Sequence, residues 1–158
     1  MKFYRIRKTV KNAWDNNFEL LKTDREKYFQ DIKDFLSKSR RKPYHFFRWH
    51  VSGDIMDQDY LENMKGIAKE YPDMNFLAFT KRYDLDFSDL PKNLAVVFSA
   101  WPDWPLPEHS LPVAWMQDGT ETRYDEDKTL ECPGNCETCG MCWSLKKIDR
   151  DVIFHKHN

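Results

Sequence analysis

Four cysteines near the C-terminal end of the chain are the residues best suited to chemistry. They follow the spacing C-x3-C-x2-C-x2-C, and the chain has no other cysteine. Thiolates are soft ligands that bind iron–sulfur clusters and zinc. A disulfide scaffold joins distant loops, which cysteines confined to one short segment cannot do. The candidate metal ligands are Cys132, Cys136, Cys139 and Cys142.

The spacing of these cysteines favours a [4Fe-4S] cluster over zinc. The irons of a cubane cluster sit at separate corners, so one short loop can wrap around them. Structural zinc sites usually take two cysteine pairs separated by about a dozen residues or more, whereas only Glu137 and Thr138 separate Cys136 from Cys139. Zinc and unligated redox thiols are the alternatives. Three ligands would leave one iron open for a substrate, while four would close the cluster and indicate electron transfer or a structural role.

Small and polar residues follow the apolar segments that we expect to form strands. If these strands are parallel neighbours, their carboxyl ends share one edge of the sheet, where ligands bind in α/β proteins. Gly53 would let a ligand approach the backbone closely, Asp54 suits a cationic group and Lys81 an anionic one. The candidate ligand-binding residues are Ser52, Gly53, Asp54, Thr80, Lys81 and Ser99. The alternative is that they only form the turns that end strands. His50 fits a hydrogen-bonded core histidine.

The N-terminal segment predicts two amphipathic helices. Residues 9–22 carry an apolar stripe at helical spacing. Thr23 is the expected N-cap of the next helix, and Glu26 completes a capping box. We expect both helices to cover one face of a sheet.

The rest of the chain predicts strands and one long helix. A strand at 45–51, a helix at 58–71 and a strand at 75–80 have the length of a βαβ unit. Further strands are expected at 94–99, 112–116 and 151–155, and residues 118–131 are acidic and irregular. The expected fold is a single α/β domain over residues 1–158 with a mostly parallel sheet of about four or five strands. Its parts are the N-terminal helices (1–43), a βαβ-type core (44–117), and an acidic loop, cysteine cluster and terminal strand (118–158).

Composition and charge exclude several classes of protein. Aromatic residues make up 15% of the 158 residues, which excludes a disordered chain. No apolar run approaches the roughly 20 residues that span a bilayer, and the N-terminus lacks the apolar region of a secretory signal. Residues 1–42 hold 13 Lys and Arg against 6 Asp and Glu. This excess could attract nucleic acid, but the charges are spread through helical patterns and are better interpreted as solvated helix faces.

The ordered segments FRWHVSGDI, YLENMKGIAKEYPDMNFLAFTKR, LPKNLAVVFSAWPD, CPGNCETCGMCW and VIFHKH resemble the phage-encoded gene product 88 family. That family is distantly similar to radical S-adenosylmethionine enzymes. The resemblance covers the chain from about residue 9 onward and implies a partial (β/α) barrel or open parallel sheet. It also implies an iron–sulfur cluster on the four cysteines and, at 52–54, a turn that receives the amino group of S-adenosylmethionine. Longer members carry a cysteine-containing stretch before the first helix, which this sequence lacks.

Three functions are consistent with these features. The first is a phage or prophage iron–sulfur protein, in the cytoplasm of a bacterial host, whose [4Fe-4S] cluster is structural or carries electrons. The second is a radical-type enzyme that binds S-adenosylmethionine or another small ligand at the strand ends. The third is a zinc-stabilised module that binds nucleic acid or a partner through the basic residues within 2–42. No substrate follows from the sequence.

Overall fold

The computed structural model describes residues 8–38, 44–50 and 52–155. The chain divides into two compact units, residues 1–43 and residues 44–158. In the part of the chain that the structure describes, no helix has the length and apolar character needed to cross a membrane.

The first unit contains the two predicted helices, α2 (Lys8–Thr23) and α3 (Arg25–Ser37). The predicted N-cap is displaced by one residue, because Asp24 and not Thr23 caps α3. The Asp24 carboxylate accepts a 2.9 Å hydrogen bond from the backbone N–H of Lys27, whereas Thr23 is still in the last turn of α2 and its hydroxyl donates to Glu19 O. Of the basic segment, residues 1–7 and 39–42 lie outside the described residues. That the helices cover the sheet stays a prediction.

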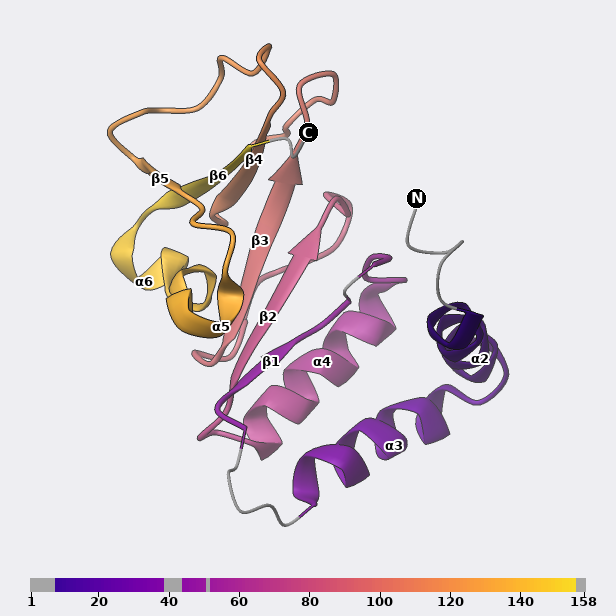
Figure 1. The fold of residues 1–158 in the computed structure, drawn as a ribbon. Helices are drawn as coiled ribbons and strands as arrows, with labels where there is room; N and C mark the ends of the chain where they lie inside the picture. The colour runs from indigo at the N-terminus through magenta and orange to yellow at the C-terminus, as the bar shows by residue number, and fades with distance from the viewer. Residues whose placement is uncertain (1–7, 39–43, 51, 156–158) are drawn as a thin grey trace. The chain divides into compact units, whose positions relative to one another are not determined.

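The second unit contains a six-stranded sheet in which every strand pair is parallel, in the order β1-β2-β3-β4-β6-β5 (Figure 1). This confirms the predicted α/β class and parallel sheet. The strands are β1 (Phe46–Arg48), β2 (Asn75–Thr80), β3 (Leu94–Ala100), β4 (Val113–Gln117), β5 (Thr129–Glu131) and β6 (Asp151–His155). The short edge strand β5 lies in a segment that we expected to be irregular. It is extended because its backbone pairs with β6. Residue 51 of the predicted first strand lies outside the described residues.

One face of the sheet is covered by α4 (Gln58–Glu70), which runs beside β1 and β2 (Figure 1). The Asp57 carboxylate caps this helix by accepting the N–H of Tyr60 at 2.9 Å. The buried residues of α4 recur at helical spacing: Tyr60, Leu61, Met64, Ile67 and Ala68. The connections at 81–93 and 101–112 contain no helix, so α4 is the single helical crossover between β1 and β4.

The cysteine segment covers the opposite face. It contains three short helical turns, α5 (Cys136–Cys139), η1 (Met141–Trp143) and α6 (Leu145–Ile148). Successive side chains of a strand point to opposite faces, so Leu77 of β2 lies on the face opposite to that of Phe76. Cys142 and Leu145 of the segment form one buried cluster with residues of β2, β3, β4 and β6: Leu77, Val97, Ala114 and Val152. The cysteine segment is therefore part of the core of this unit.

Candidate functional site

The four cysteines line one small pocket against the sheet, together with Trp143 and Val152. Cys142 is buried, Cys132 is half-buried, and Cys136 and Cys139 are exposed; no disulfide joins any of them. Over the described ranges, no three Cys, His, Asp or Glu side chains are positioned so that they could already hold a metal ion. The structure thus brings the four predicted ligands to one place without setting them in coordination geometry.

Two glycines shape the backbone around this pocket, which we call the cysteine pocket. Gly134 has a φ of 78°, and Gly140, between Cys139 and Cys142, has a φ of 62°. Both values lie in the left-handed region, which glycine adopts without steric cost. The N–H of Gly134 donates to Cys132 Sγ at 3.4 Å. Hydrogen bonds to cysteine sulfur are one means by which proteins set the potential of iron–sulfur clusters.

The electrostatics of the cysteine pocket favour a cation. The pKa of the Cys142 thiol is raised to about 12, first by burial and then by the charges of the other three cysteines, while the charge of Arg48 acts in the opposite direction. Four thiolates in an apolar pocket are costly unless a positive group compensates them. Metal binding supplies that compensation, since a coordinating thiol is deprotonated. The donor set therefore fits a metal centre.

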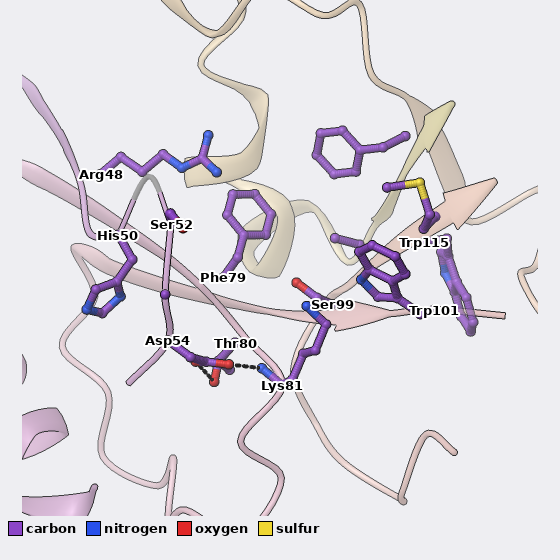
Figure 2. Close-up of a pocket in the computed structure, with 14 residues that line it drawn as sticks. Arg48, His50, Ser52, Asp54, Phe79, Thr80, Lys81, Ser99, Trp101 and Trp115 are labelled. Carbon is purple, nitrogen blue, oxygen red and sulfur yellow. Dashed lines mark hydrogen bonds between the residues drawn. The ribbon is translucent and has the colours of Figure 1, made fainter. Parts of the chain in front are cut away.

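A second, larger pocket of about 560 Å³ lies at the carboxyl ends of the strands (Figure 2). Its lining includes every ligand-binding residue predicted from the sequence: Ser52, Gly53, Asp54, Thr80, Lys81 and Ser99. The parallel arrangement of β1, β2 and β3 places these residues at one edge. We call this the strand-end pocket.

The carboxylate of Asp54 is already engaged inside the protein. One oxygen accepts the Thr80 hydroxyl at 2.6 Å and the other accepts the N–H of Lys81 at 2.7 Å, as the dashed lines in Figure 2 show. The first oxygen also accepts the N–H of Ile55 at 2.7 Å. Asp54 therefore fastens the turn after β1 to the end of β2, and its predicted contact with a cationic group stays a prediction.

His50 lies in the wall of the strand-end pocket with a φ of 50°. Its Nε2 is 2.9 Å from the Tyr60 hydroxyl. Its Nδ1 is buried and has no hydrogen-bond partner among the described residues. Burial lowers the pKa of His50, so the imidazole is neutral at pH 7.

Sequence reasoning missed a cation and several rings in the strand-end pocket. The Arg48 guanidinium lies 4.9 Å from the Phe79 ring centroid, and Lys81 Nζ lies 5.0 Å from that of Trp101. Arg48 and His50 are two residues apart at the end of β1, and this spacing could have identified Arg48 as a residue of the pocket. The remaining pocket residues come from the loop after β3, from β4 and from β6, and no local pattern links them: Trp101, Ala114, Trp115, Met116 and Phe154.

Comparison with known proteins agrees with the ordered motifs of the sequence. The family model described as Gene product 88 matches residues 2–145. The chain belongs to the Gene product 88 family. It is 27% identical over 181 aligned positions to the Gene 88 protein of Mycobacterium phage L5, covering 97% of this chain and 74% of that protein. No solved structure matches the chain.

Within this member of the Gene product 88 family, the charge of Arg48 is felt in both pockets. Its side chain lines the strand-end pocket, and its charge also acts on the Cys142 thiol.

Proposed function

We propose that this phage-family protein binds a [4Fe-4S] cluster through Cys132, Cys136, Cys139 and Cys142. The observation that carries the proposal is that all four sulfur-bearing side chains line one pocket, although each has a different degree of exposure. Three different local features produce this arrangement: the turn at Gly134, the short helix α5 and the left-handed Gly140. A bound cluster would supply one-electron transfer.

The position of the cysteine segment supports a structural contribution as well. Cys142 belongs to the same buried cluster as Leu77 and Val97 of the sheet, so ligands on either side of it would be held against the core. Trp143 packs edge-on against Phe46 of β1, with ring centroids 5.1 Å apart. Trp143 also lines the cysteine pocket, where it would cover part of a bound cluster and so affect the potential of that cluster.

Metal analysis of the full chain, purified without oxygen, tests the proposal. We expect iron and acid-labile sulfide in equal amounts, with a broad visible absorption that bleaches on reduction. Zinc alone in a colourless protein would support the zinc alternative and overturn the cluster. Protein that contains neither metal and cannot be reconstituted with iron and sulfide would overturn both.

Single replacement of each cysteine by serine identifies the ligands. Loss of iron in all four variants indicates a closed, four-ligand cluster, whereas a Cys142→Ser variant that keeps its iron indicates three ligands. Ser144→Ala is the matched control, because Ser144 lies in the same segment and its hydroxyl only donates to Met141 O. The control should keep the metal content of the unaltered protein.

A further inference from the structure

The strand-end pocket carries an excess of positive charge. Its charged side chains are two cations, Arg48 and Lys81, and one carboxylate, Asp54. That carboxylate accepts hydrogen bonds from the Thr80 hydroxyl and from two backbone N–H groups. Neither Arg48 nor Lys81 forms an ion pair within the described residues; the contacts of their charged groups are with the rings of Phe79 and Trp101. Two cations without carboxylate partners in one pocket fit an anionic ligand.

Aromatic rings form much of the remaining wall. Figure 2 shows Phe79 between Arg48 and the side of the pocket occupied by Lys81 and Trp101. Trp101 is 43% exposed, so much of its indole surface is still accessible to a ligand. Indole and phenyl faces stack on flat rings, and an adjacent cation strengthens such contacts. The pocket therefore offers stacking surface next to its positive charge.

The size of the strand-end pocket also fits a small molecule. The volume of about 560 Å³ is within the range of small-molecule sites.

We propose that the strand-end pocket binds a small anion that carries a flat ring, with the chemistry and size of a mononucleotide. Arg48 and Lys81 bind the anionic group, and Trp101 stacks on the ring. No cysteine lines this pocket, so the inference is independent of the metal in the cysteine pocket.

Isothermal titration of the full chain tests the proposal, with the four ribonucleoside 5′-monophosphates, the corresponding nucleosides and inorganic phosphate as probes. We expect at least one monophosphate to bind tighter than its nucleoside and than phosphate, with an affinity that falls as salt is raised. Phosphate that binds as tightly as every nucleotide would overturn the role of the ring. S-adenosylmethionine, which carries a sulfonium, should bind more weakly than the best monophosphate; tighter binding would overturn the charge assignment.

Two pairs of variants separate the charge from the ring. Lys81→Gln should weaken nucleotide binding about tenfold, the equivalent of one charged contact, while Lys92→Gln, at an exposed lysine outside the pocket, should not change it. Trp101→Leu should weaken nucleotide binding and leave phosphate binding unchanged. Trp104→Leu is its control, because Trp104 is in the same loop, is 53% exposed and does not line the pocket. Equal effects within either pair would overturn the assignment, and neither result depends on metal content.

Discussion

The hydroxyl of Thr80, the last residue of β2, donates a 2.6 Å hydrogen bond to the carboxylate of Asp54 in the segment after β1. These residues are 26 positions apart, so the hydrogen bond can form only once β1 and β2 are paired. It gives Asp54 a structural function at the edge of a pocket where its charge alone suggested a contact with ligand.

Replacing Asp54 with asparagine should destabilise the protein by about 1–3 kcal/mol. The substitution puts an NH2 group in place of one carboxylate oxygen, and this group cannot accept a hydrogen bond from a backbone N–H. Urea unfolding measures the change. Asp73→Asn, at an exposed aspartate in the turn before β2, is the control and should stay within about 0.5 kcal/mol of the unaltered protein. Equal stability of the two variants would show that the Asp54 bonds contribute nothing.

Asn93 joins the end of α4 to the sheet. Its side-chain amide donates to the carbonyl oxygens of Ala68, Tyr71 and Met74 at 2.8 to 3.0 Å. Asn93→Asp should cost about 1–3 kcal/mol or more, since a carboxylate cannot donate and leaves carbonyl groups without a partner. Thermal unfolding measures this, with Asn63→Asp as control. Asn63 makes a single exposed bond to Asp59 O, so a loss at Asn63 as large as that at Asn93 would contradict the prediction.

Two glycines should respond to alanine with opposite signs. Gly66 is exposed within α4, and a Cβ at this position would meet only open space, so Gly66→Ala should stabilise the protein by about 0.5–1 kcal/mol. Gly140 has a φ of 62°, so Gly140→Ala should destabilise it by about 1–2 kcal/mol and lower its metal content. Chemical unfolding of both variants gives the signs, and a stabilising Gly140→Ala would refute the left-handed turn between Cys139 and Cys142.

The stability of the protein should fall as the pH drops below about 6.5, the ordinary pKa of histidine. Burial lowers the pKa of His50, with Asp54 acting in the opposite direction, and burial also lowers that of His109. In this pH range the unfolded chain binds more protons than the folded one, so stability present above pH 6.5 is lost as the pH falls through the folded pKa. His50→Gln should flatten the slope of unfolding free energy against pH. An unchanged slope would mean that His50 is not held neutral.

The metal-free protein should show an ordered reactivity of its thiols. Cys136 and Cys139 are exposed, whereas Cys142 is 9% exposed and its pKa is raised to about 12, first by burial. Because the thiolate is the reactive form, iodoacetamide at pH 8 should modify Cys136 and Cys139 first and Cys142 last. Peptide mass spectrometry over time gives the order. Cys142 reacting as fast as Cys136 would show that its segment does not rest on the sheet in the metal-free state.

Local sequence patterns were sufficient for most of the elements. The predicted strands at 75–80 and 151–155 match β2 and β6 at both ends, and the predicted helix at 58–71 differs from α4 by one residue. Side-chain periodicity and turn residues are properties of neighbouring positions, so they can be read directly. The N-cap at Asp24 was missed by one residue because Thr23 and Asp24 are both good caps, and the end of α2 decided between them.

The sequence by itself determined the α/β class, the parallel strands, the grouping of the four cysteines and the polar residues at the strand ends. Only the tertiary structure decided that the cysteine segment packs on the sheet face opposite α4, that Asp54 is engaged by Thr80 and Lys81, and that Arg48 lines the strand-end pocket. The physical reason is that these relationships join residues far apart in the chain. Their partners are chosen by strand order and by which face each side chain occupies, and neither is encoded in a local pattern.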